Sequence, residues 1–220
     1  DWGKDCIHIP FGLVSLEEGT MSTRHGRVVF LEEVLRKAVE KTKDIILTRG
    51  VNTDLADDVS KQVGIGAVIF QELANNRIKD YTFSWDKILN FEGETGPYVQ
   101  YTHARAASIL RNGENEFKEA KKDFDNVKFE YIMSEAAYML SKLIYGFPDV
   151  VKESAERYEP SIITRYIVDV AQAFNRFYHD EHILVENVEE KKAKLLLVYA
   201  AMQTIRNGLK LLGIDAPERM

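Results

Sequence analysis

Cysteine is almost missing from this sequence, which has a single one, Cys6, in 220 residues. One cysteine excludes a disulfide within the chain and is typical of a reducing compartment, so we expect a cytoplasmic protein. Long apolar runs are missing too, because no stretch reaches the roughly 18 apolar residues of a membrane-spanning helix. We therefore expect no membrane partner. The sequence starts at Asp1 and enters a strand-like run directly, which predicts a fragment of a longer protein.

An excess of positive charge is also missing. The chain has 29 lysines and arginines against 35 aspartates and glutamates, which gives a net charge of −6. Proteins that hold nucleic acid mainly by neutralising phosphates are basic, so this class is disfavoured and we expect no DNA partner. Any contact with RNA has to be local, through a few aromatic and arginine side chains.

The common catalytic motifs do not occur. The sequence has no Gly-x-Gly-x-x-Gly, no Walker-type loop and no Gly-x-Ser-x-Gly. His179 and His182 have helix-like spacing, but no third ligand follows at a familiar distance, so the sequence predicts no metal site. Residue chemistry alone gives no complete active site.

The sequence does contain helical patterns, with a smaller mixed part in front of them. Residues 6–16 predict strand and turn, because Ile7, Ile9 and Phe11 alternate, while apolar residues recur at helical spacing over about 31–47 and 54–74. Residues 80–91 begin extended and then fit one helical turn. Beyond Phe91 the composition is almost wholly helical, so we place a domain boundary there.

The second half predicts a helical bundle, which makes the whole chain mainly α with a small α+β part in front. Residues 113–127 are highly charged and predict a solvated loop. Pro148 and Pro160 each fit the first turn of a helix, and Gly213 fits the end of the last one. After a first helix that ends near residue 112, these signals predict helices over about 129–145, 148–157, 161–178 and 187–212.

Residues 93–110 combine a helix start with an aromatic edge. Pro97 fits the first turn of a helix. On that helix Tyr98, Tyr101 and Arg105 fall at i, i+3 and i+7, along one strip at the edge of an apolar stripe. Two rings and a guanidinium could stack unpaired bases and bond a base edge or phosphate. The same spacing fits an ordinary core edge with Arg105 in a salt bridge, and spacing alone favours this plainer interpretation.

Two further features could contribute to binding. Residues 19–26 form a polar loop between two glycines, whose hydroxyl, guanidinium and backbone N–H groups could touch a phosphate. An ordinary polar turn explains this loop equally simply. Tyr178 follows Phe174 and Phe177 near the end of a predicted helix and also fits a core edge.

Four stretches match one known family. They are Met21-Ser22-Thr23-Arg24 with Gly26, Tyr81-Thr82-Phe83-Ser84-Trp85, the helix at 93–108 and the ending at 208–220. Together they resemble the arginyl-tRNA synthetases of the bacterial type, from end to end of this chain. The similarity covers only the C-terminal part of those enzymes.

The resemblance implies a class I aminoacyl-tRNA synthetase whose parent protein joins arginine to its tRNA with ATP and Mg. It implies that residues 1–30 end the catalytic domain with a KMSKS-like loop and that residues 31–91 support the inner corner of the tRNA. Residues 92–220 would be the all-helical anticodon-binding domain named after the DALR motif. The partners implied are arginine-specific tRNA, ATP and arginine, and we expect the parent to be a monomer.

The resemblance also implies roles for individual residues. The loop that steadies the ATP phosphates would consist of Met21, Ser22, Thr23 and Arg24. Tyr98, Tyr101 and Arg105 match the family's anticodon-contacting helix. Tyr178 matches a further contact, and Met220 matches the C-terminal methionine that lies near the anticodon.

The sequence departs from the family in ways that affect activity. Thr20 and Thr23 stand where other class I synthetases carry the two loop lysines. The HIGH motif and the arginine pocket do not occur in the chain. We therefore expect this fragment to be inactive alone and to hold no cofactor. The alternative function is a helical protein–protein interaction module that uses the same aromatics as hot spots without binding RNA.

Overall fold

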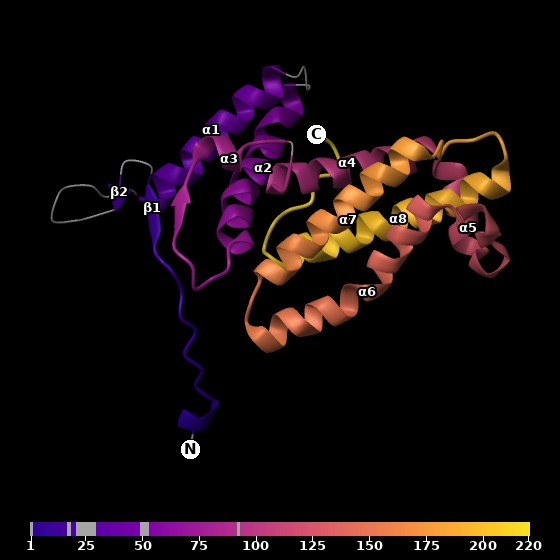
Figure 1. Cartoon of the computed structure of the whole chain (residues 1–220). Helices are drawn as coiled ribbons and strands as arrows, with labels where there is room; N and C mark the ends of the chain where they lie inside the picture. Colours follow the sequence, from indigo (N-terminus) through magenta and orange to yellow (C-terminus); the bar gives the residue numbers. More distant parts are fainter. Residues whose placement is uncertain (1, 17–18, 21–29, 49–52, 92) are drawn as a thin grey trace.

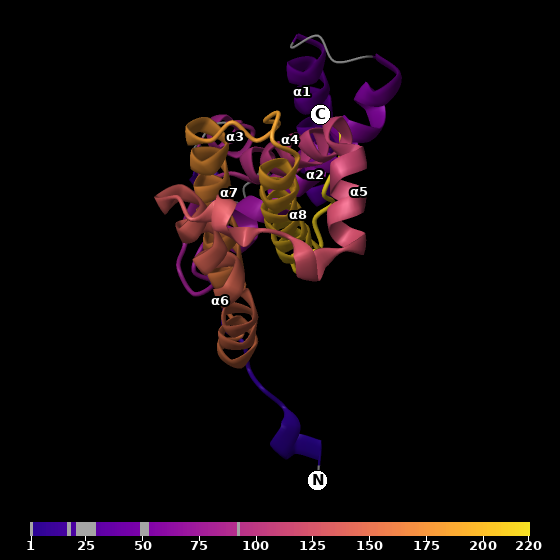
Figure 2. The same ribbon diagram turned by 90° about the vertical axis from the view of Figure 1, so that its right-hand side faces the viewer.

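The computed structural model describes residues 2–16, 19–20, 30–48, 53–91 and 93–220. Helices dominate these ranges, and a small sheet lies near the N-terminal end (Figure 1). The prediction of a mainly α fold, with a helical bundle behind a small mixed part, is confirmed. The N-terminal 3₁₀ turn, Trp2–Asp5, projects away from the helices in both views (Figures 1 and 2).

The sheet has three short strands in the order β2-β1-β3. Strand β1 (Val14–Leu16) pairs antiparallel with β2 (Gly19–Thr20) and parallel with β3 (Tyr81–Phe83). Of the strand and turn predicted over 6–16, only the last three residues form a strand, and the strand expected around the alternating Ile7, Ile9 and Phe11 is wrong. The alternating side chains Ile7 and Phe11 are exposed, because the described part of the chain offers that segment no partner strand.

Two long helices form a hairpin behind this sheet, as the helical patterns predict. Helix α1 spans Leu31–Thr48 and α2 spans Thr53–Ala74, and a short helix α3 (Trp85–Ile88) follows β3. Gly64 lets the two long helices approach closely. A Cβ atom built there would lie 2.9 Å from the backbone carbonyl carbon of Ala38.

The bundle consists of five further helices. Helices α4, α7 and α8 pack against one another, α6 covers α7 and α8, and α5 lies against α8 (Figure 2). Helix α8 ends just before Gly213, whose φ of 74° suits glycine and confirms the predicted stop. Their bounds are α4 Gly96–Asn112, α5 Glu114–Lys122, α6 Glu135–Arg157, α7 Ser161–Asp180 and α8 Val188–Leu211.

The structure corrects two predictions in the bundle. The charged loop expected over 113–127 contains α5, because Ala120 is buried and the Phe117 ring lies 5.1 Å from the Tyr199 ring. The two helices expected over 129–145 and 148–157 are one helix, α6, which starts at the Ser134 cap. Pro148 lies inside it at an exposed turn, where the loss of one backbone hydrogen bond is tolerated.

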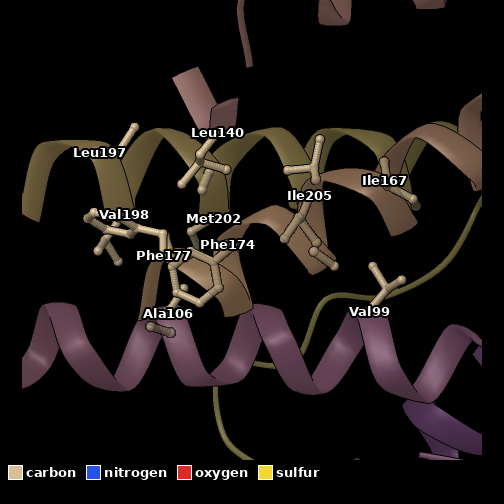
Figure 3. Close-up of a cluster of buried hydrophobic side chains, with 14 of the residues drawn as sticks. Val99, Ala106, Leu140, Ile167, Phe174, Phe177, Leu197, Val198, Met202 and Ile205 are labelled. Carbon is tan, nitrogen blue, oxygen red and sulfur yellow. The ribbon is translucent and has the colours of Figure 1, made fainter. Parts of the chain in front are cut away.

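The core of the bundle lies where α4, α6, α7 and α8 meet (Figure 3). Phe174 and Phe177 from α7 are completely buried at its centre. The predicted apolar stripe of α4 faces this core and is buried along its whole length, at Val99, Thr102, Ala106, Ile109 and Leu110. With this stripe buried, the strip of Tyr98, Tyr101 and Arg105 lies along the edge of the buried face of α4.

We expect Gly64→Ala to lower the free energy of unfolding by about 1 kcal/mol or more. Alanine favours helix by about 1 kcal/mol over glycine, but here its methyl group would collide with the α1 backbone, which cannot rotate away. Urea denaturation of both proteins measures this change. Lys61→Ala, on the exposed face of the same helix, is the control and should change stability by less than about 0.5 kcal/mol. Equal or higher stability of Gly64→Ala would contradict the close packing.

Candidate nucleic-acid interface

The start of α4 sets the direction of the aromatic strip. Thr95 has extended backbone angles, and its hydroxyl accepts a hydrogen bond from the Tyr98 N–H at 3.3 Å. Pro97 occupies the first turn, as the sequence predicts. This cap fixes the helical register in which Tyr98, Tyr101 and Arg105 share one edge.

Arg105 lies over two aromatic rings from different helices. Its Cζ atom is 4.9 Å from the ring centroid of Tyr101, one turn back on α4, and 5.3 Å from that of Tyr178, near the end of α7. Both distances lie within the range of cation–π attraction. The two tyrosines remain 37% and 44% exposed, so both side chains can be reached from solvent. Among the described residues no acidic side chain pairs with Arg105, whose side-chain hydrogen bond is to Asn175. The plainer interpretation of the sequence, a core edge with Arg105 in a salt bridge, is therefore not what the described residues show.

A cleft of about 430 Å³ opens beside this group. Four of the five predicted anticodon-contact residues line it together, although they come from α4, from α7 and from the C-terminal tail. We call it the α4 cleft, and it is lined by Tyr101, Ala104, Arg105, Ser108, Arg111, Tyr178, Glu218, Arg219 and Met220.

Tyr98, the fifth predicted contact, does not line the α4 cleft. Its ring is half-buried and packs against the bundle core, and its hydroxyl accepts a hydrogen bond from the Asn175 side chain at 2.9 Å. In this structure Tyr98 packs against its neighbours, and its ring is not free to contact a ligand in the cleft.

Asn175 is a residue that the sequence analysis missed. Its Oδ1 atom accepts a hydrogen bond from Arg105 Nη1 at 2.5 Å, and its Nδ2 atom donates to Thr102 Oγ1 at 3.0 Å as well as to Tyr98. It lies one turn before Tyr178 on the same edge of α7. That spacing was the available signal, since an asparagine between buried aromatics needs polar partners.

The C-terminal tail reaches the cleft because α4 holds its backbone. Gln100 Nε2 donates to the Asp215 carbonyl at 2.8 Å, and Arg111 Nη1 donates to the Glu218 carbonyl at 3.0 Å. Between them His103 Nδ1 lies 2.9 Å from the Pro217 carbonyl. These contacts carry the chain end back beside α2 and α4, where Figures 1 and 2 show the C-terminus.

His103 is completely buried, which decides its protonation. A carbonyl oxygen cannot donate, so Nδ1 carries the hydrogen of the neutral ring, and Nε2 has no partner among the described residues. Burial lowers the pKa of His103, and the nearby charge of Arg206 lowers it further. The Pro217 bond and the Glu218 charge oppose this shift without overcoming it. The tail is therefore held by an uncharged imidazole.

A buried lysine fixes the loop that follows Tyr178. Lys194 Nζ lies 2.7 Å from Glu181 Oε2 and 2.8 Å from Glu190 Oε1, and it donates to the His182 carbonyl at 3.0 Å. Two carboxylates and a carbonyl satisfy all three ammonium hydrogens in an almost buried place. The end of α7, and with it Tyr178, is thereby tied to α8.

The predicted phosphate-binding residues Met21, Ser22, Thr23 and Arg24 lie outside the described residues. In the part of the chain that is described, no group of three or more His, Cys, Asp or Glu side chains is placed to hold a metal ion. The described helices include none that is long and apolar enough to cross a membrane.

We expect the free energy of unfolding to fall as the pH drops below about 6.5, the usual pKa of histidine. The folded chain keeps His103 neutral, whereas the unfolded chain takes up a proton, so acid favours unfolding. Above that pH the contribution is complete. Urea denaturation across this range, compared with His103→Asn, isolates the effect, since asparagine can donate to Pro217 but does not titrate. Parallel pH profiles of the two proteins would contradict it.

Comparison with known proteins supplies two family matches. Residues 99–220 match the model described as "DALR anticodon binding domain", and residues 2–85 match "tRNA synthetases class I (R), catalytic domain". The solved structure of the Thermus thermophilus arginyl-tRNA synthetase is similar, with a TM-score of 0.82 and 29% identity over 97% of this chain and 35% of that one. The Plasmodium falciparum arginyl-tRNA synthetase shares the fold, with a TM-score of 0.74 at 24% identity.

The curated relatives agree with these matches. The arginine–tRNA ligases of Halothermothrix orenii and Clostridioides difficile are 54% and 55% identical to all 220 residues of this chain. The chain spans 38% of the length of each of these relatives. The chain therefore belongs to the arginyl-tRNA synthetase family, with a DALR anticodon binding domain at residues 99–220.

Proposed function

We propose that the chain binds the anticodon stem-loop of an arginine-specific tRNA in the α4 cleft. The observation that carries this proposal is the convergence of Tyr101, Arg105, Tyr178 and Met220 on one cleft. They come from three places far apart in the sequence, and all four lie in the range that matches the DALR domain. Exposed rings beside a guanidinium suit unpaired bases, which are what an anticodon loop offers.

Stacking accounts for binding by an acidic chain. Each base stacked on an aromatic ring contributes about 1–3 kcal/mol, and this contribution needs no excess of positive charge. The open parts of Tyr101 and Tyr178 can each take one base, and Arg105 can donate to a base edge between them. Arg111 and Arg219 add positive charge at the same cleft, although the whole chain carries −6. In this proposal Tyr98 does not contact the RNA but helps to hold the neighbouring residues in place.

For the whole protein we propose the reaction of its relatives, the attachment of arginine to its tRNA with ATP and Mg in the cytoplasm. Within this chain we propose three parts: residues 1–30 as the end of the catalytic domain, 31–91 as the support of the inner tRNA corner, and 92–220 as the anticodon-binding domain. One family match ends at residue 85 and the other begins at residue 99, so the proposed boundary near residue 91 falls between them. The loop Met21–Arg24 would contact the ATP phosphates in the complete protein.

We expect Tyr101→Ala to weaken binding of the cognate anticodon stem-loop by roughly 5- to 150-fold, the equivalent of one lost base stack. Fluorescence anisotropy with the labelled stem-loop measures this change on the 220-residue chain. In the complete protein the same substitution should reduce tRNA charging more than it reduces arginine-dependent adenylate formation.

Tyr145→Ala is the matched control. Tyr145 is 87% exposed on α6, which packs on α7 and α8 rather than lining the cleft, so its loss should leave the affinity unchanged. A stem-loop with an altered anticodon should bind more weakly than the cognate one. Two results would mean that the helical region is better explained as a protein–protein interaction module. Either the chain binds neither stem-loop, or it binds the cognate and the altered stem-loop equally whether or not Tyr101 is replaced.

A further inference from the structure

Asn175 makes contacts of two kinds from a single amide group. Its two donor bonds, to the hydroxyl oxygens of Tyr98 and Thr102, join α7 to α4 on the core side. Its carbonyl oxygen accepts a hydrogen bond from Nη1 of Arg105 at 2.5 Å, and Arg105 lines the α4 cleft. The donor contacts alone would be an ordinary link between helices. The acceptor contact ties that link to the charged group of the proposed binding site.

This contact restricts a side chain that is otherwise flexible. A guanidinium has five N–H donors in one plane, and the bond to Asn175 uses one of them. The Cζ atom also lies over the rings of Tyr101 and Tyr178, and contact with both rings limits the movement of the guanidinium further. The remaining N–H groups of Arg105 are then held in one orientation at the cleft. A planar donor edge that is fixed before binding suits a base edge with two acceptors.

We propose that Asn175 is a positioning residue that fixes Arg105 for recognition of an unpaired base. The inference rests on the proposed function, since it concerns how the α4 cleft selects among RNA loops. Asn175 itself does not line the cleft. Its effect reaches the RNA through Arg105, so it governs discrimination between anticodons more than the stability of the bundle.

Three variants of the 220-residue chain separate this role from a structural one. Asn175→Leu removes the acceptor and both donors. Asn175→Asp keeps an acceptor for Arg105 and a second oxygen to which the Tyr98 hydroxyl can donate. Tyr98→Phe removes one bond of the link between the helices and leaves the bond between Asn175 and Arg105 intact. Thermal unfolding of each variant reports the structural cost.

Binding of the cognate and the anticodon-altered stem-loops gives the decisive measurement. We expect Asn175→Leu to reduce the ratio of the two affinities about tenfold, as for the loss of one charge-assisted hydrogen bond. Asn175→Asp and Tyr98→Phe should keep the ratio of the unaltered chain. A ratio that Asn175→Leu leaves unchanged would overturn the proposal, as would an equal loss of affinity for both RNAs, which would assign Arg105 to a phosphate.

A double-mutant cycle with Arg105→Ala tests whether Asn175 acts through Arg105. If it does, adding Asn175→Leu to Arg105→Ala lowers discrimination no further. A further loss on that background would overturn the proposal. Equal binding of both stem-loops by the unaltered chain would instead refute the proposed function. In that case the NMR signals of the Arg105 guanidinium, separate in the unaltered chain and averaged in Asn175→Leu, would still show whether the contact orders this side chain.

Discussion

Helix α4 has only a narrow edge open to solvent, and this burial governs what surrounds it. Eleven of its 17 residues are buried, and several of them are polar. A buried polar group without a partner costs about 1–3 kcal/mol, so partners from other elements stabilise these side chains. Gln100 and His103 find carbonyls of the tail, and Thr102 finds Asn175 on α7. The elements that form the walls of the α4 cleft, the tail and α7, are therefore the ones that hydrogen-bond the buried polar side chains of α4.

The electrostatics of the cleft differ from those of the whole chain. Arg105, Arg111 and Arg219 gather where the tail meets α4, while the molecule as a whole is acidic. Long-range attraction of RNA is weak in such a protein, and salt screens what remains within about 10 Å. In the proposed complex, recognition then depends on short-range contacts that few RNA loops can make at once. This arrangement favours selectivity over general affinity for nucleic acid.

The sequence predicted what depends on local pattern and missed what depends on tertiary partners. The periodic helices near 31–47 and 161–178 were predicted almost to their ends, and the helical edge of Tyr101 and Arg105 followed from spacing. The strand expected around Ile7 and Phe11 failed because a strand requires a partner, and helix α5 was missed because its charged face hid Ala120. Met220 came only from the family resemblance, and for Tyr178 the residues alone left a core edge as the alternative. Nothing local showed that Asn175 would meet Arg105, since 70 residues separate them.

In its hydrogen bonds to α4 the tail uses main-chain oxygens. Asp215, Pro217 and Glu218 each contribute a carbonyl, and none contributes its side chain to those bonds. Backbone anchoring leaves the identity of Glu218 free, although its side chain lines the cleft. This position can therefore accumulate substitutions at little cost to the fold. Under the proposed function, substitutions at this position can change which bases the cleft prefers while the scaffold stays the same.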